Sequence, residues 1–129
     1  MKQKVNVSRN SRTPFMQDTV QYIAETPNLS YVGDLIGTKD YEFQKKFVDL
    51  LKIEFTSDLG KYLYHIKIDE PRAAAEVVHK LKYKFSVLGM KKAFVFAENH
   101  KERLHDGNTD LDADFRKTLK TVSSFLETV

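Results

Sequence analysis

The most constraining feature of the sequence is the spacing of its apolar residues, which recur at steps of three and four through most of the chain. This spacing places apolar side chains on one face of an α-helix. No segment alternates between apolar and polar residues for long enough to predict a sheet. The pattern therefore predicts an all-α fold. Its longest series, in residues 40–68, consists of Phe43, Phe47, Leu50, Leu51, Phe55, Leu59, Tyr62, Leu63 and Ile66.

Proline and helix-capping residues predict where the helices begin. Thr13-Pro14 and Asn28 suit the starts of two short N-terminal helices, over about residues 14–25 and 29–37. Because the later connections are short, sequential helices should pack as antiparallel neighbours. We expect an up-down antiparallel four-helix bundle, preceded by one or two short N-terminal helices. Its four helices should span about residues 40–68, 71–88 and 90–105, and the chain from about residue 110 onward.

A chain of 129 residues is long enough for one domain and too short for two well-packed cores. We assign residues 13–129 to this domain and residues 1–12 to a flexible basic arm. The chain's net charge is +3, and the arm alone contributes +4, so the domain carries −1. Because the excess positive charge lies in the arm, the net charge of the chain does not indicate a nucleic-acid partner for the domain, and we expect none. Nucleic-acid binding through the arm remains an alternative, and such binding would weaken steeply with salt.

Composition excludes several classes of protein. There is no cysteine, so disulfide frameworks, thiolate zinc sites and cysteine nucleophiles are excluded. No apolar run approaches the roughly 18 residues of a membrane span, and the first twenty residues lack the apolar core of a secretory signal. We expect a soluble cytoplasmic protein without a membrane partner, and the initial methionine favours a free-standing chain.

The helix over residues 71–88 carries the side chains of greatest chemical interest. At 100° per residue, His79 lies roughly 140° from the middle of the apolar face, so it should face solvent. A neutral imidazole is a good nucleophile near neutral pH. Lys82, one turn away, can stabilise an anionic group on that ring. The same exposed side should hold Arg72, Ala75, Glu76, Lys82, Tyr83 and Ser86.

The segment from His79 to Gly89, HKLKYKFSVLG, resembles the signature of the histidine-containing phosphotransfer (HPt) family. That signature reads His-x-Leu-Lys-Gly, with a second glycine six residues after the first. The segments LIGTKDYEFQKKFVDLLKIEF, KIDEPRAAAEVV and MKKAFVFAENHKERLHDG resemble the family's neighbouring helices and turn. The resemblance covers about residues 29–128 and implies a four-helix bundle.

The resemblance also implies a function and a set of roles. His79 matches the phosphoacceptor, Lys82 the lysine that steadies the phosphoryl group, and Gly89 the turn glycine at the helix end. Arg72, Ala75, Glu76, Tyr83 and Ser86 would form the docking surface for receiver domains.

The implied partners are the receiver domains of a hybrid sensor histidine kinase and of a response regulator. The chain would be a monomeric phosphocarrier rather than an enzyme, without its own ATP-binding domain. It would have no cofactor of its own, and the receiver would supply Mg²⁺.

Tyr83 departs from the HPt signature, which has glycine at this position. Its ring could crowd a docking receiver, or pack against it and narrow the choice of partner. The departure keeps open a second hypothesis, a helical module that binds a receiver or another protein without carrying phosphate. A third possibility is that His79 is an ordinary surface histidine without a function.

The remaining histidines have no spacing typical of a metal site and should lie at the surface or at helix ends; they are His65, His100 and His105.

Overall fold

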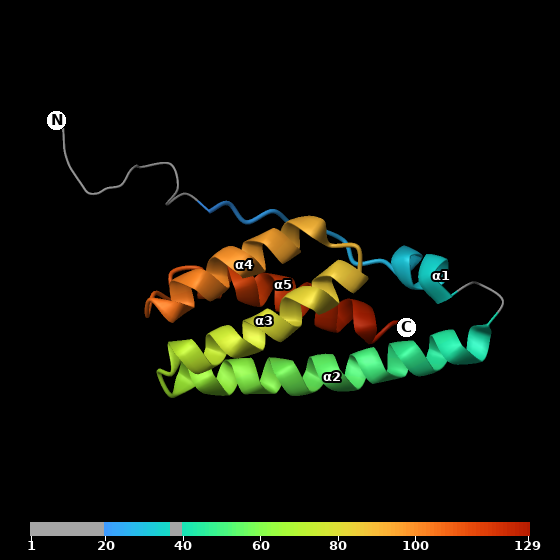
Figure 1. The fold of residues 1–129 in the computed structure, drawn as a ribbon, viewed down its shortest axis with the longest axis horizontal. Helices are drawn as coiled ribbons and strands as arrows, with labels where there is room; N and C mark the ends of the chain where they lie inside the picture. Colours follow the sequence, from blue (N-terminus) through green and yellow to red (C-terminus); the bar gives the residue numbers. More distant parts are fainter. Residues whose placement is uncertain (1–19, 37–39) are drawn as a thin grey trace.

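The computed structural model describes residues 20–36 and 40–129. Within these ranges the chain forms five helices and no strand, which confirms the all-α prediction (Figure 1). The described part contains no helix that is both long and apolar enough to cross a membrane. The basic arm of residues 1–12 lies outside the described residues. The helices are α1 (Ser30–Ile36), α2 (Tyr41–Lys67), α3 (Pro71–Val87), α4 (Lys91–His105) and α5 (Asp112–Leu126).

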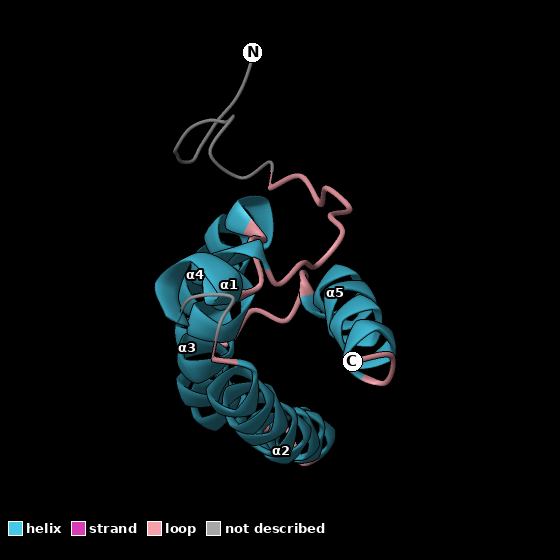
Figure 2. Cartoon of the chain, turned by 90° about the vertical axis from the view of Figure 1, so that its right-hand side faces the viewer, coloured by secondary structure: helices cyan, strands magenta, loops and turns pink. Residues whose placement is uncertain are grey.

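The four longer helices surround one core. α3 packs against α2 on one side and, most extensively, against α4 on the other, while α5 contacts α4 and α2 (Figures 1 and 2). On α3 and α5 the apolar residues that recur at steps of three and four are buried, as this spacing predicts. These are Ala74, Val78, Leu81, Phe85 and Leu88 on and just after α3, and Leu111, Phe115, Leu119, Val122 and Leu126 just before and on α5.

The first turns of α2 extend beyond the ends of its neighbours (Figure 1). Phe43, in the first turn of α2, is 55% exposed although the sequence placed it on the inward face. Leu50 was placed there as well and is 54% exposed, while Val48 and Leu51 beside it are buried, so the side chain of Leu50 points away from the core. Further along the same helix, Leu51, Phe55 and Tyr62 are buried as expected. The apolar series thus predicted the helix correctly but not how much of it is covered.

The prediction of a helix over residues 14–25 is wrong in its described part, because residues 20–29 have no regular secondary structure. This segment instead packs on the bundle (Figure 2). The Tyr22 ring meets Phe96 of α4 edge-on at 6.0 Å. The Glu25 carboxylate accepts hydrogen bonds from the backbone N–H groups of Lys92 and Ala93, at 3.0 and 2.6 Å. It therefore caps the first turn of α4, where a negative charge is favourable.

A polar cluster joins three helices inside the core. The Tyr62 hydroxyl of α2 donates to Oδ1 of Asp112 at 2.5 Å and lies 2.8 Å from Nε2 of His100 on α4. Since the hydroxyl has a single proton, Nε2 of His100 must be the donor in the second contact. His100 is fully buried, so the expectation of a surface or helix-end position is wrong for this residue.

Burial determines the protonation of this cluster. Desolvation lowers the pKa of His100 to about 4, because the surrounding side chains disfavour a charged ring, although the Asp112 carboxylate opposes the shift. Burial and the hydrogen bond to Asp112 raise the pKa of Tyr62 above its usual range. Within the part of the chain that the structure describes, His100 Nδ1 has no hydrogen-bond partner. Together these values indicate a neutral His100 at pH 7.

Acidification should destabilise the fold through His100. An unfolded histidine binds a proton near pH 6.5, but folded His100 does so only near pH 4. Between these values the unfolded state holds more protons, so stability is lost as the pH falls through this window. The loss in the free energy of unfolding should reach about 3 kcal/mol. Urea denaturation at a series of pH values measures it.

The variant His100→Phe isolates this contribution. It should be less stable at pH 7 because Tyr62 loses a donor, yet its stability should fall less steeply between pH 6.5 and pH 4. The exposed His105→Gln is the control and should retain the steep fall. Equal pH dependence in wild type and His100→Phe would contradict the assignment.

Candidate functional site

His79 lies in the middle of α3 and is exposed, as its position on the helical wheel predicts. Its ring faces α4, where the ammonium nitrogen of Lys101 is 3.5 Å from Nδ1. Within the described residues no hydrogen bond engages Nε2. The ring therefore presents one nitrogen to a cation and leaves the other available to a ligand.

Tyr83, one turn beyond His79, covers one side of the imidazole. The two rings meet edge-on with centroids 5.4 Å apart and an interplanar angle of 89°. The Tyr83 ring also lies 6.1 Å from Phe94 of α4. The side chain is nonetheless 53% exposed. The tyrosine at the glycine position of the HPt signature thus restricts the approach to His79 from one direction.

The expectation that Lys82 lies on the exposed side of α3 is wrong. Its side chain is buried at the boundary between α3 and α4, with only 5% of its surface exposed, because it packs against two aromatic rings and a carboxylate of that boundary. Its ammonium nitrogen is 3.5 Å from Oε2 of Glu98 and lies over the rings of Tyr83 and Phe94, 5.2 and 5.4 Å from their centroids. Its charge is therefore balanced by Glu98. Among the described residues, the ammonium group within hydrogen-bonding distance of the His79 ring belongs to Lys101, not to Lys82.

The site thus includes residues of α4 that the sequence interpretation had not singled out. Phe94, Glu98, Lys101 and His105 follow one another at steps of four, three and four, so they share one face of α4. That face lies beside the buried row that contains Ala97 and Leu104. The helical period of α4 could have identified the row, but nothing in the sequence indicates that it faces His79.

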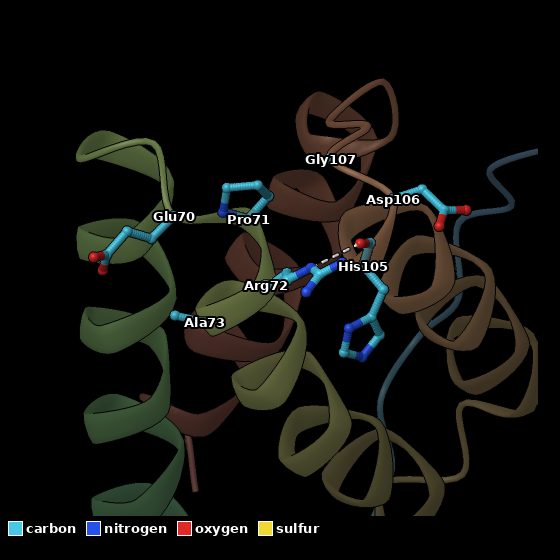
Figure 3. Close-up of a pocket in the computed structure, with 7 residues that line it drawn as sticks. All are labelled: Glu70, Pro71, Arg72, Ala73, His105, Asp106 and Gly107. Atoms are coloured by element: carbon cyan, nitrogen blue, oxygen red, sulfur yellow. Dashed lines mark hydrogen bonds between the residues drawn. The ribbon is translucent and has the colours of Figure 1, made fainter.

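Two exposed members of the expected docking surface contact the last residue of α4. The Arg72 guanidinium donates from Nε to the carbonyl oxygen of His105 at 3.2 Å, and His105 Nε2 is 3.6 Å from Oε2 of Glu76. Arg72 and the carbonyl of His105 border an open pocket of about 730 Å³ at this end of the molecule (Figure 3). The pocket is lined by Glu70, Pro71, Arg72, Ala73, His105, Asp106 and Gly107.

Ala75 corrects the expected docking surface. It was placed on the exposed side near His79, but it is fully buried. Its side chain ends at Cβ, so it does not reach past the close contact between α3 and α4. The other four predicted docking residues are exposed, namely Arg72, Glu76, Tyr83 and Ser86.

Gly89 ends the α3 turn with a φ of 74°, the left-handed conformation that the sequence predicts there. The Met90 N–H donates to the Phe85 carbonyl at 2.9 Å, the six-to-one hydrogen bond of a Schellman motif. Asn28 packs directly on the glycine, and its own N–H donates to the Leu88 carbonyl at 2.9 Å. The turn between α3 and α4 is therefore held against the N-terminal segment by these contacts with Asn28.

No protein-family model matches this chain, and no curated protein or solved structure shows significant similarity to it. Across residues 20–36 and 40–129, no three histidine or acidic side chains are grouped so that they could hold a metal ion. A functional interpretation therefore depends on the residues around His79 and on the chemistry that their arrangement permits.

Replacing Gly89 with alanine should destabilise the fold more than replacing Gly107. Both glycines have positive φ, 74° and 81°, so each substitution should cost about 1 kcal/mol of backbone strain. At Gly89 the new Cβ would also lie 2.6 Å from Nδ2 of Asn28, whereas Gly107 has open space. The clash should add about 1 kcal/mol. Thermal or urea unfolding of both variants measures the difference. Equal losses in the free energy of unfolding would show that the Asn28 side chain moves away from the new Cβ at no cost.

Proposed function

We propose that this chain is a histidine phosphotransfer protein of a multistep phosphorelay, with His79 as the phosphoacceptor. The observation that carries the proposal is the His79 ring itself. It is exposed on a rigid helix, has Nε2 unengaged within the described residues, and has an ammonium group 3.5 Å from Nδ1. The packing of α2, α3, α4 and α5 around one core supports an up-down antiparallel four-helix bundle as the scaffold.

The proposed transfer uses a lone pair of the imidazole. In the tautomer with the proton on Nδ1, Nε2 of His79 attacks the phosphorus of a receiver's aspartyl phosphate. The bond from phosphorus to the aspartate oxygen breaks, its electron pair returns to the carboxylate, and the ring proton passes to solvent. The reverse sequence delivers the phosphoryl group to the aspartate of a second receiver. The partners are thus receiver domains of a hybrid sensor kinase and of a response regulator.

Two lysines can stabilise the transferred group. Lys101 lies beside the ring without a carboxylate partner among the described residues, so its charge is available. Lys82 is held by Glu98, and a phosphoryl group on His79 would compete with that carboxylate for the ammonium. In this proposal the chain has no cofactor or ATP site of its own and acts as a carrier. The Mg²⁺ that neutralises the acyl phosphate belongs to the receiver.

The surface around His79 supports docking of a receiver. The exposed residues Arg72, Glu76, Tyr83 and Ser86 precede and follow His79 at helical steps of four and three, so they form one stripe along α3. A partner that contacts this stripe would place its own reacting group at the imidazole. We propose a monomer, because the stripe must be free to receive its partners in turn.

Incubation with phosphorylated receivers tests the phosphoacceptor. Wild type should acquire an acid-labile, base-stable label from at least one receiver of the source organism, and His79→Ala should acquire none. His65→Ala is the matched control, since it removes another histidine that lies next to a tyrosine. A label that persists in His79→Ala, or no transfer from any receiver, would refute the proposal.

The burial of Lys82 and the cover provided by Tyr83 favour one alternative function. A bundle of this shape could bind a receiver or another protein without carrying phosphate. Such a module would bind its partner equally well in wild type and His79→Ala and would acquire no label. Partner titrations run beside the transfer assay therefore separate the two functions.

Tyr83→Gly should change the rate or the partner range of transfer. The substitution removes the ring that touches His79, Lys82 and Phe94, and ring contacts of this kind contribute about 0.5–1.5 kcal/mol. A change of about three- to tenfold is expected for one or more receivers.

Tyr64→Gly is the matched control for this experiment. Tyr64 is likewise exposed in a helix and meets a neighbouring histidine edge-on, at 5.5 Å. Each variant should lose about 1 kcal/mol of helix stability, so rates are compared below both melting temperatures. Equal rates for wild type and Tyr83→Gly against every receiver would show that the ring has no part in docking.

A further inference from the structure

We propose that Lys101 is a positioning residue that prolongs the life of phosphorylated His79. Its ammonium group would hold Nδ1 of the modified ring as a hydrogen-bond acceptor and so oppose hydrolysis of the phosphoryl group on Nε2. This inference rests on the proposed function, because it requires a phosphoryl group on that nitrogen. The observation that carries it is the 3.5 Å separation between Lys101 Nζ and His79 Nδ1.

The charge of Lys101 is available to His79. Lys82, the other lysine at the boundary between α3 and α4, is paired with Glu98 at 3.5 Å. Within the described ranges no carboxylate lies within 4.0 Å of Lys101 Nζ. Its positive charge therefore acts on the imidazole without a neutralising neighbour.

The other ionisable groups of the exposed α3–α4 face do not replace Lys101 at Nδ1. On α4, Glu98 contacts Lys82, and His105 contacts Glu76 of α3. Tyr83 meets the imidazole through its ring. Arg72 of α3 donates to the carbonyl of His105, and Lys80 of α3 lines a pocket beside α2. Among the described residues, neither of these cations nor Glu102 of α4 is hydrogen-bonded to the His79 ring.

Hydrolysis of phosphohistidine depends on the protonation of its second nitrogen. Water attacks phosphorus, the bond from phosphorus to Nε2 breaks, and its electron pair returns to the ring, releasing inorganic phosphate. A ring that is protonated on Nδ1 leaves as neutral imidazole, whereas an unprotonated ring would have to leave as an anion. A cation that donates a hydrogen bond to Nδ1 disfavours the protonated form. Lys101 therefore slows the loss of the group to water.

The length of the contact suits this role. At 3.5 Å it exceeds the usual range of about 2.7–3.2 Å for an N–H donor, so it leaves the unmodified ring free to place its proton on either nitrogen. Phosphorylation of Nε2 leaves Nδ1 as the one remaining acceptor and adds negative charge that attracts the ammonium. The contact should therefore tighten after transfer, when protection is needed.

His65 provides the opposite arrangement in the same chain. Its Nδ1 lies 3.1 Å from Oε1 of Glu70, so a carboxylate takes the place that Lys101 takes at His79. An anion at Nδ1 favours a protonated ring. A phosphoryl group placed chemically on both histidines should consequently be lost faster from His65 than from His79.

The test loads the full-length protein with phosphoramidate, a small donor that requires no receiver. Phosphorus-31 NMR then follows the loss of the phosphoryl group from pH 5 to pH 9, with the His79 signal assigned by its absence in His79→Ala. At pH 7 we expect Lys101→Gln to lose the group about threefold faster than wild type, and Lys101→Glu about tenfold faster. Both should shift the pH midpoint of hydrolysis upward, while Lys101→Arg should restore wild-type behaviour.

Two controls separate this effect from general damage. Lys120→Gln, an exposed lysine of α5, carries the same change of charge and should leave the His79 rate unchanged. The His65 signal should decay equally in wild type and Lys101→Gln. A wild-type rate and pH midpoint in Lys101→Gln would overturn the inference even if receivers do phosphorylate His79. Conversely, a clear Lys101 effect without transfer from any receiver would overturn the proposed function alone.

Discussion

The close packing of α3 against α4 is the contact on which the arrangement of the site depends. Ala75 and Lys82 are buried beside this contact, whereas Arg72, Glu76, Tyr83 and Ser86 stay exposed. The same packing brings Glu98 to Lys82, and Lys101 to His79, across the boundary between the helices. The N-terminal segment helps to hold this packing, since Glu25 caps α4 and Asn28 packs on the turn glycine between the two helices. The environment of the imidazole is therefore a property of the helix pair rather than of α3 alone.

The features that could be predicted from the sequence are those that depend on one helix alone. Apolar spacing located the four long helices, and the helical wheel placed His79 toward solvent, because both depend only on the period of the helix. The sequence also predicted the positive φ of Gly89, which the local turn requires. Ala75 shows the limit of the same reasoning. Its direction on the wheel is close to that of His79, yet a short side chain is covered where a neighbouring helix packs closely.

Features that depend on two distant segments were not predictable in this way. The pairing of Lys101 with His79 depends on the register between α3 and α4, which no local pattern contains. His100 is buried because Tyr62 offers it a hydrogen-bond partner from another helix. Residues 20–29 do not form a helix, although residues 14–25 begin with suitable capping residues. Contacts with α4 stabilise this segment in an irregular conformation, and such tertiary contacts outweigh a weak local preference.

Lys82 and Lys101 differ in whether their charge is already paired, and this difference would suit the reversible binding of a phosphoryl group at His79. Lys82 is buried against two aromatic rings and already balanced by Glu98, so its charge changes the local field little until a stronger anion competes for it. Lys101 has no such partner among the described residues, so its charge is available to the ring. An incoming phosphoryl group would draw on both, but only Lys82 would have to give up an existing ion pair. In the proposed transfer, the net gain from Lys82 would therefore be smaller than its position in the sequence suggests, and more of the electrostatic stabilisation would come from Lys101 on α4.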